Sequence, residues 1–321
     1  MVKICYACSA GGHLEEISPL IAQVKCDEYY FVTINRTDSR SILKNKKVFF
    51  VTDTNRNIVS TIRNFFQSIN IFLKNKPDII ITIGAGVALA TCIIAKVYGR
   101  KIVFIETLAK IDTPSLFGRF LYPIADITLL QWKEQKRFYK KGKYIGPLLN
   151  FQNLRKPKKK KQIFVTVGTN QFPFDRMIAE MDKLAKTTLK RYKVFAQIGN
   201  SHYIPRNIKF KKFLEYSEMK TLYKNSEIVV CQAGVGSITN ALSNNCKTII
   251  VPRYKRLGEH VDNHQLDISK KFDKMRLLEV AYKIEDLRKK IQIIITRKNT
   301  IKFKNYSIIK YNINEYLTNK M

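Results

Sequence analysis

The sequence has few of the residues that mark disordered, fibrous or membrane-spanning proteins. Glycine and proline together contribute only 22 of 321 residues (13 + 9), while hydrophobic residues make up 45%. This composition excludes a collagen-like or intrinsically disordered chain and leaves enough apolar side chains for a large core. At about 100–200 residues per domain, the length predicts two domains.

Acidic residues are also scarce. The chain has 25 Asp and Glu against 58 Lys and Arg, a formal net charge of +33. Such an excess indicates an anionic partner, which is nucleic acid, a membrane surface or a phosphorylated substrate. AT-rich coding is an alternative explanation of this charge, because it raises Lys, Ile and Asn together and all three are abundant here. A nucleic-acid-binding protein is the less favoured class, because the basic residues are spread along the chain and no recognition motif occurs.

Cysteines do not form a disulfide framework, and no secretory signal pattern is present. The six cysteines are scattered, and Cys5 and Cys8 are expected to point to opposite faces of one strand. These features predict reduced thiols in a cytoplasmic protein. The uncharged stretch Ile79–Ala95 approaches the length of a membrane span, but its glycine-rich centre predicts a strand, a loop and a helix instead.

The chain divides into two halves that follow the same plan. The basic, polar stretch 151–162 is predicted to be a linker between a domain at 1–150 and a domain at 163–321. Each half opens with an apolar strand, Val2–Cys8 or Ile163–Val167, that runs into a glycine loop. The halves therefore predict two domains of similar topology.

The two halves resemble each other most closely in their later parts. Residues 78–105 and 227–251 both contain a buried strand, a glycine loop, a helix and a second apolar strand. Continuous apolar strands joined by helices are typical of parallel sheets buried on both faces. The predicted fold class is α/β, with two Rossmann-like domains facing across a cleft and ligands at the carboxyl ends of the strands.

Two polar clusters stand at such strand ends in the second half. Gly234, Gly236 and Ser237 open a helix whose free N–H groups suit a diphosphate, although a tight turn would look the same. The run Gly258–Gln265 is rich in side chains that bind sugar hydroxyls, and a solvated loop is its alternative reading. His260 and His264 lack a HExxH context and a clear third ligand, so no metal is predicted.

The first half offers candidates for acid–base chemistry and for surface binding. His13 follows two glycines at the mouth of the first sheet and is a candidate general base, with Glu106 as a second candidate nearby. A helix-start histidine and a strand-end acid are the structural alternatives. Mixed aromatic and basic residues around 63–76 and 116–121 indicate either interfacial binding or core-facing helices.

The ordered motifs resemble a known family. The first half resembles the PssD-type subunit of bacterial capsule and exopolysaccharide glycosyltransferases in Cys8–Leu14, Lys76–Asp78, Gly84–Val87, Ile105–Glu106, Pro114–Ser115, Gln131–Trp132 and Tyr144–Gly146. The second half resembles its PssE-type partner in Phe164–Thr169, Gln197–Gly199, Ala233–Ser237 and Glu259–Gln265. The pair is similar to the two-subunit GlcNAc transferase of eukaryotic N-glycan assembly and, more distantly, to MurG.

The resemblance implies a GT-B fold and an inverting transfer from a UDP-sugar to a polyprenyl-pyrophosphate-linked sugar. It favours galactose or glucuronic acid in β-1,4 linkage during capsule or exopolysaccharide assembly, with UDP-GlcNAc transfer to a chitobiose-type lipid as the alternative. The resemblance implies neither a cofactor nor a metal. It implies no separate partner subunit either, because both halves are fused in one chain. The expected location is peripheral, on an anionic membrane surface at the inner face of the cytoplasmic membrane. A catalytically silent sugar-nucleotide-binding subunit is a further alternative.

The resemblance also assigns roles to individual residues. It places the donor diphosphate at Gly234, Gly236 and Ser237, opposite Gly168 and Thr169, and the donor sugar at Asn263, His264 and Gln265. Asn240 stands where MurG-like enzymes carry a ribose-binding Glu, so its role there stays open. On the acceptor side it implies His13 and Glu106, with the loop glycines Gly11, Gly12, Gly84 and Gly86. The tail Ser307–Leu317 is predicted to return to the first domain.

Overall fold

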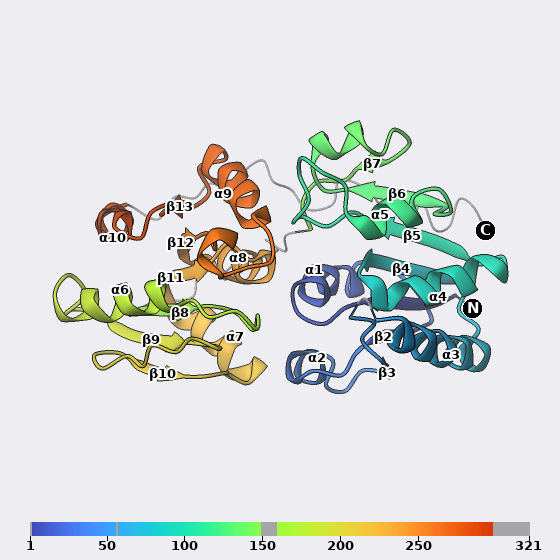
Figure 1. Ribbon diagram of the computed structural model, residues 1–321, viewed down its shortest axis with the longest axis horizontal. Coiled ribbons are helices and arrows are strands. Elements are labelled where there is room, and N and C mark those ends of the chain that lie inside the picture. Colours follow the sequence, from blue (N-terminus) through green and yellow to red (C-terminus); the bar gives the residue numbers. More distant parts are fainter. Residues whose placement is uncertain (1, 56, 149–158, 298–321) are drawn as a thin grey trace. The chain divides into compact units, whose positions relative to one another are not determined.

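The computed structural model describes residues 2–55, 57–148 and 159–297, which fall into two compact units divided near residue 149 (Figure 1). Most of the predicted linker and the predicted tail helix Ser307–Leu317 lie outside the described residues. One predicted boundary shifts, because the first strand of the second unit already begins at Lys160, within the stretch 151–162 assigned to the linker. Its first two residues, Lys160 and Lys161, are lysines and hide the strand start from a reading based on apolar runs.

The first unit is a seven-stranded parallel sheet in the order β3-β2-β1-β4-β5-β6-β7. Its elements are β1 (Lys3–Cys8), α1 (Gly12–Ile21), β2 (Glu28–Ile34), α2 (Thr37–Ile42), β3 (Val48–Val51), α3 (Ile58–Asn75), β4 (Ile79–Gly84), α4 (Gly86–Val97), β5 (Lys101–Ile105), α5 (Leu116–Leu121), β6 (Ile127–Leu130), the 3-10 helix η1 (Lys133–Arg137) and β7 (Lys143–Tyr144).

Helices cover both faces of this sheet. Alternate residues of β1 enter different cores: Tyr6 and Cys8 pack with α1, whereas Cys5 and Ala7 pack with α3, α4 and α5. Burial on both faces explains why the strands are continuous apolar runs rather than alternating ones. Cys5 and Cys8 lie in opposite cores, as predicted, and none of the six cysteines is in a disulfide.

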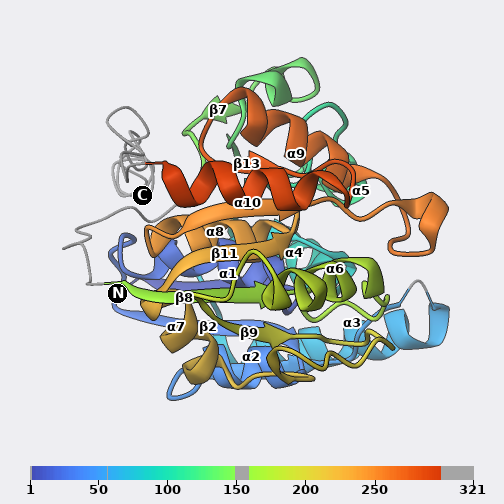
Figure 2. The same cartoon turned by 90° about the vertical axis from the view of Figure 1, so that its left-hand side faces the viewer.

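The second unit is a six-stranded parallel sheet in the order β10-β9-β8-β11-β12-β13. Its elements are β8 (Lys160–Thr166), α6 (Asp175–Lys186), β9 (Lys193–Gln197), β10 (Lys209–Lys211), α7 (Tyr216–Asn225), β11 (Ser226–Gln232), α8 (Val235–Ser243), β12 (Lys247–Val251), the 3-10 helix η2 (Lys255–Leu257), α9 (His264–Lys274), β13 (Glu279–Val280) and α10 (Asp286–Thr296). Helices α6 and α10 share a core on one face of the sheet (Figure 2).

Both sheets reverse their strand order at the same relative position. In the first unit β1 pairs with β2 on one side and β4 on the other, and in the second β8 pairs with β9 and β11. Such a reversal opens a crevice at the carboxyl ends of the two central strands, where ligands of open α/β sheets bind. The predicted glycine loops follow β1 and β4 in the first unit and β8 and β11 in the second. The fold therefore places them at the crevice of each sheet where ligands bind.

The segment Ile79–Ala95 forms strand β4 and most of helix α4, as predicted. Among the described residues, no helix is both long enough and apolar enough to span a bilayer.

Candidate functional site

The two glycine loops of the second unit meet at the side chain of Gln232. Gly168 follows β8 with a φ of 73°, and a Cβ atom there would overlap the amide nitrogen of Gln232. A Cβ at Gly234, which follows β11, would lie 2.9 Å from the same nitrogen. The backbone conformation favours glycine at Gly168, and at both positions a Cβ atom would displace the end of the Gln232 side chain.

Gln232 is a site residue that the sequence analysis did not single out. Its side chain is buried, its Nε2 donates to Ser237 Oγ at 3.1 Å, and its Oε1 has no partner among the described residues. Ser237 lies in the first turn of α8, whose unpaired N–H groups carry the positive end of the helix dipole. The helix N-terminus suits an anionic group of a ligand, and the unpaired Oε1, which can only accept, suits a donor such as a ligand hydroxyl.

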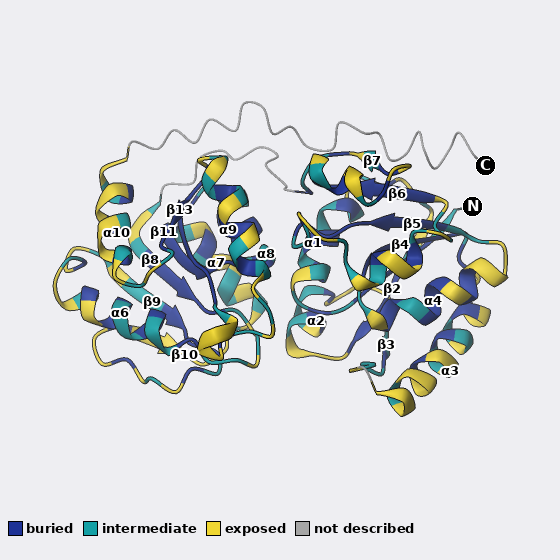
Figure 3. Ribbon diagram, turned by 45° about the horizontal axis from the view of Figure 1, so that its top comes forward, coloured by how far each residue is buried: buried dark blue, intermediate teal, exposed yellow. Residues whose placement is uncertain are grey.

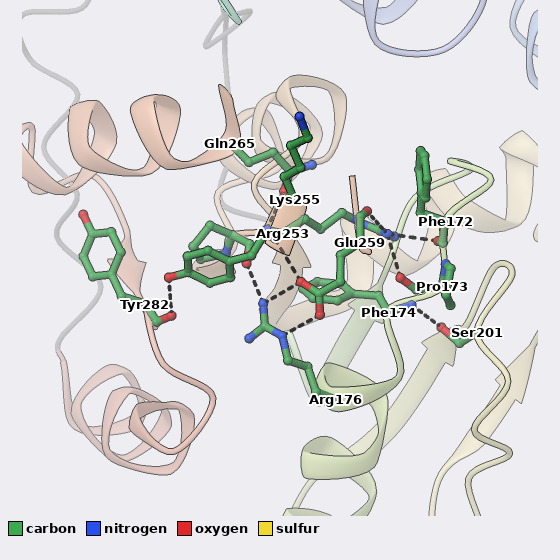
Figure 4. A network of polar contacts seen from close by, with 12 residues as sticks. Phe172, Pro173, Phe174, Arg176, Ser201, Arg253, Lys255, Glu259, Gln265 and Tyr282 are labelled. Atoms are coloured by element: carbon green, nitrogen blue, oxygen red, sulfur yellow. Dashed lines mark hydrogen bonds and ion pairs between the residues drawn. The ribbon is translucent and has the colours of Figure 1, made fainter. Parts of the chain in front are cut away.

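A buried arginine ties the loops of this unit together (Figure 4). Arg253 follows β12, is fully buried, and donates to the carbonyls of Val167, Phe172, Pro173 and Glu259 at 2.9–3.0 Å. Burial lowers the pKa of Arg253 to about 10, so it stays charged at neutral pH. Because Val167 precedes Gly168, this side chain fixes the glycine loop relative to the polar run 258–265.

An ion pair anchors the start of that run. Arg176 Nε and Nη2 contact the carboxylate of Glu259 at 2.6 and 3.0 Å, and Nη2 also donates to Pro252 O at 2.7 Å. Glu259 further accepts from the backbone N–H of Tyr254 at 3.0 Å. The bidentate geometry between mostly buried groups holds the loop in one conformation.

The three residues predicted to hold the donor sugar differ in burial and in hydrogen bonding. Gln265 is buried and its Oε1 accepts from Arg253 N at 3.0 Å, so that oxygen is committed to the loop rather than to a ligand. Asn263 is exposed and its Oδ1 accepts from Lys255 N at 3.0 Å. Asn240 donates to Gly236 O of its own helix at 2.9 Å, and Thr169 is exposed beside Gly168.

His264, the third of these residues, joins His260 around Asp262. Both imidazole Nδ1 atoms contact Asp262 Oδ1, at 3.2 Å from His260 and in a hydrogen bond from His264. Burial and the neighbouring His264 lower the pKa of His260, and although burial raises that of Asp262, the adjacent His264 outweighs it and lowers the pKa overall. The sequence argument against a metal rested on a missing third ligand, and the fold supplies Asp262 in that place.

In the first unit the predicted acceptor glycines surround two helix starts. Gly11 precedes α1 with a φ of 75°, Gly12 begins it, and His13 follows with its Nδ1 2.8 Å from Ser9 Oγ. Gly84 and Gly86 flank the turn from β4 into α4, where a Cβ would meet Phe117 or Thr54 respectively. All of these residues lie at the carboxyl ends of β1 and β4.

Glu106 is not placed as a surface acid. It is fully buried, and its carboxylate accepts from Thr107 N at 2.9 Å, from Ser115 N and Oγ at 3.1 Å, and from the Tyr139 hydroxyl. Three of these donors bind Oε2, and Oε1 accepts only from Thr107 N. These bonds show that Glu106 holds the loop between β5 and α5, and its role as an acid or base stays a prediction.

Glu16, which the sequence analysis missed, lies in the same network. It is fully buried on α1 and accepts from Thr107 Oγ1 at 2.9 Å, from Leu108 N at 2.7 Å and from Gln131 Nε2. Burial raises its pKa to about 7. An acid in a helical pattern looks like a solvent-facing residue, and only its contact with the loop after β5 shows its burial.

The pKa of Glu16 predicts a pH dependence of stability. The folded state keeps a proton on Glu16 up to about pH 7, whereas the unfolded chain releases it near the ordinary glutamate pKa of 4.5, so the folded state binds more protons in between. The free energy of unfolding should fall as pH rises through this window. Glu16→Gln imitates the protonated acid and should remove that fall.

Urea unfolding at pH 5 and pH 8 measures this effect. The fluorescence of Trp132, the sole tryptophan, reports on the same network because its Nε1 donates to Leu108 O at 2.9 Å. Glu15→Gln, one residue earlier and partly exposed, is the control and should keep the wild-type pH profile. Parallel profiles for the wild type and Glu16→Gln would refute the prediction.

Comparison with known proteins relates each half of the chain to a family. A model of the "Oligosaccharide biosynthesis protein Alg14 like" family matches residues 4–148, and a model of the glycosyltransferase family 28 C-terminal domain matches residues 162–313. The chain joins an Alg14-like domain to a glycosyltransferase family 28 C-terminal domain. This combination agrees with the fused two-subunit type that the motifs predicted.

Individual relatives cover different parts of this Alg14-like and family 28 chain. The Homo sapiens UDP-N-acetylglucosamine transferase subunit ALG14 is 26% identical over 98 residues, 29% of this chain and 45% of the human protein. The UDP-N-acetylglucosamine–N-acetylmuramyl-(pentapeptide) pyrophosphoryl-undecaprenol N-acetylglucosamine transferase of Caldanaerobacter subterraneus is 22% identical over 275 residues, 78% of this chain and 74% of that protein. The chain thus spans less than half the length of the ALG14 relative.

Solved structures show the fold class. The crystal structure of Acinetobacter baumannii MurG matches with a TM-score of 0.56 and 16% identity over 92% of both chains. The UDP-GlcNAc 2-epimerase of Methanocaldococcus jannaschii matches with a TM-score of 0.63 and 14% identity, over 93% of this chain and 94% of the epimerase. The predicted GT-B fold is confirmed, and because an epimerase shares it, the fold by itself does not fix the reaction.

Proposed function

We propose that this chain is a UDP-sugar-dependent glycosyltransferase that acts on a polyprenyl-pyrophosphate-linked sugar. The observation that carries the proposal is the presence in one chain of an Alg14-like half and a family 28 half, each with glycine loops at the strand-order reversal of its sheet. A relative of the first half is named a transferase subunit, and a relative along most of the chain is named a transferase to a pyrophosphoryl-undecaprenol substrate. Neither name describes an epimerase.

In the proposed reaction the second unit holds the donor. The loops at Gly168 and Gly234 let a diphosphate approach the backbone, and the first turn of α8 supplies N–H groups and a dipole that stabilise the leaving UDP. Gln232 and Ser237 add an amide and a hydroxyl at the same place. No step requires a metal, because these groups already compensate the negative charge of the leaving group.

The first unit supplies the acceptor chemistry. His13 is the proposed general base, which takes the proton of the acceptor hydroxyl as it attacks the anomeric carbon with inversion. Ser9 orients the imidazole through the bond to Nδ1. Glu106 and Glu16 act as positioning residues, since they hold the loop after β5 and touch no substrate in this scheme.

Two donor classes follow from different arguments. The PssD- and PssE-type motifs favour transfer of galactose or glucuronic acid in polysaccharide assembly, whereas the names of the curated relatives favour GlcNAc. A donor screen tests the function and separates the two. The purified full chain is given each UDP-sugar with a prenyl-pyrophosphate-linked glucose or GlcNAc acceptor, and UDP release is measured.

Each outcome of the screen has one meaning. Release with UDP-galactose or UDP-glucuronate on the glucose lipid supports polysaccharide assembly, and release only with UDP-GlcNAc on the GlcNAc lipid supports the N-glycan-type reaction. Interconversion of UDP-GlcNAc without any acceptor identifies an epimerase. Absence of both UDP release and UDP binding would overturn the proposal.

The proposed acceptor is a lipid, and the first unit has an exposed apolar surface suited to a membrane. Helix α4 packs against both α3 and α5. The three helices expose large apolar side chains with basic residues among them: Ile58, Val59, Ile62, Phe66, Ile93, Val97, Leu116 and Phe120, with Arg63, Lys74 and Arg119. Figure 3 marks the exposed positions along α3 and α4 in yellow. Apolar residues interleaved with positive charge favour an anionic bilayer surface. We therefore place the protein peripherally at the inner face of the cytoplasmic membrane.

Serine at three of these positions should release the protein from vesicles. Phe66, Val97 and Phe120 are 65%, 78% and 69% exposed, one on each helix. The triple serine variant is expected to lower partitioning to vesicles containing phosphatidylglycerol by at least about tenfold, because each side chain loses its apolar contact with lipid. Sedimentation with the vesicles measures the bound fraction.

The control lies in the other unit. Ile204→Ser removes an apolar side chain that is 59% exposed in unit 2 and should leave vesicle binding unchanged. Equal losses in both variants would contradict a membrane surface on α3, α4 and α5.

A further inference from the structure

A three-residue cluster at the end of the loop before α9 and at the first residue of that helix has the composition of a metal site. His260, Asp262 and His264 alternate along the loop, and one donor atom of each lies within 4.8 Å of the other two. No other such cluster occurs in the part of the chain that the structure describes. We propose that these three side chains bind one divalent transition-metal ion of the Zn²⁺ class.

The side chains already converge on one point. The His260 Nδ1 is 3.2 Å from Asp262 Oδ1, the His264 Nδ1 contacts the same oxygen, and the two imidazole centroids are 4.5 Å apart with the planes at 79°. Tetrahedral Zn²⁺ with bonds of about 2.0–2.1 Å keeps its donor atoms about 3.3 Å apart. Binding therefore exchanges the hydrogen bonds to Asp262 for bonds to the metal with only small side-chain movements.

Buried anchors hold the cluster from both sides. Glu259, immediately before His260, is clamped by Arg176, and Gln265, immediately after His264, accepts from the backbone of Arg253. Ligands carried by a segment fixed at both ends lose little conformational freedom on binding. The segment between the anchors contains the three ligands and two further residues.

The donor set selects the kind of metal. Two imidazoles and one carboxylate suit Zn²⁺ or Co²⁺, whereas Mg²⁺ prefers oxygen ligands alone. Three protein ligands leave a fourth position for water or another group. Three ligands and the nearby positive charge of Arg253 predict a weaker affinity than that of a four-ligand structural zinc site. The site shares His264 with the proposed donor-sugar residues, but metal binding by it does not depend on the proposed transfer.

Binding is tested on the full chain with Zn²⁺ by calorimetry and with Co²⁺ by its visible absorption. The chain has four histidines, so side-chain NMR can resolve each imidazole. We expect one ion per chain and shifted signals for His260 and His264 only. A Cys26→Ser background removes the one cysteine that is not buried and would otherwise bind Zn²⁺. Mg²⁺ should compete poorly.

Two variants and one matched control decide the outcome. His264→Gln and Asp262→Asn should each weaken Zn²⁺ binding at least tenfold, and both residues are exposed enough for the fold to persist, which circular dichroism checks. His202→Gln alters the other His–Asp pair of this unit, an exposed contact of 3.3 Å to Asp175, and should bind as the wild type does. No binding by the wild type, or equal affinity in all four proteins, would overturn the metal site.

Discussion

Replacing His13 with alanine is expected to lower the rate of sugar transfer by about 10²–10⁴-fold, the usual contribution of a positioned general base. The imidazole lies in the first turn of α1, at the carboxyl end of β1, with Ser9 on its Nδ1. Ser9→Ala should cause a smaller loss, because the base remains but is no longer oriented by the hydroxyl. Initial rates of UDP release with the donor and acceptor found in the screen measure both.

Donor binding separates a catalytic effect from a folding defect. The donor loops belong to the second unit, so His13→Ala should bind UDP with wild-type affinity in a calorimetric titration. His202→Gln, an exposed histidine of the second unit, should keep full activity. A His13→Ala enzyme within threefold of the wild-type rate would remove His13 from the mechanism and leave the base to be found elsewhere.

The largest expected effect on stability comes from Arg253. Arg253→Met keeps much of the buried volume but leaves the carbonyls of Val167, Phe172, Pro173 and Glu259 without their donor. Buried acceptors that lose a charged donor are costly, and we expect a loss of about 3–5 kcal/mol in the free energy of unfolding of the second unit. Arg253→Lys should recover only part of it, because an ammonium group has three donors and no planar fork.

Two probes show where this loss falls. Trp132 belongs to the first unit, so its fluorescence should report an unchanged urea transition, while circular dichroism shows an earlier transition for the second unit. Arg256→Met, an exposed neighbour that stacks on Tyr254, should change stability by less than about 0.5 kcal/mol. Similar curves for Arg253→Met and Arg256→Met would show that the buried network contributes little.

Periodicity and loop composition predicted the fold well. The strand predicted at Val2–Cys8 is β1 at Lys3–Cys8, and the segment 78–105 contains a strand, a glycine loop, a helix and a second strand in the predicted order. Continuous apolar runs are unambiguous in a sheet covered on both faces, since every side chain of the strand is buried. The strand start at Lys160 was missed for the opposite reason, because its first residues are exposed lysines.

The candidate site was predictable in position but not in the role of each side chain. Gly168, Gly234 and His13 lie at the strand ends where the motifs placed them. Glu106 and Gln265, in contrast, look like ligand-binding residues in a linear reading and are buried partners of the backbone in the fold. Glu16 gave no local signal because its partners lie in a distant segment, and the role of Gln232 became visible only from its contact with the distant Gly168.

The amino-acid sequence by itself determined the two parallel sheets, their repeated plan and the glycine loops at their strand ends, because hydrophobic periodicity and glycine placement are local properties of the chain. Tertiary structure alone decided which polar side chains face a ligand and which hold the scaffold. That choice depends on burial and on partners far along the chain, as for Arg253 with Val167 and Glu16 with Leu108. Desolvation then sets the charge state of these buried groups and the free energy that their burial costs. It depends on the folded surroundings and not on the residue type.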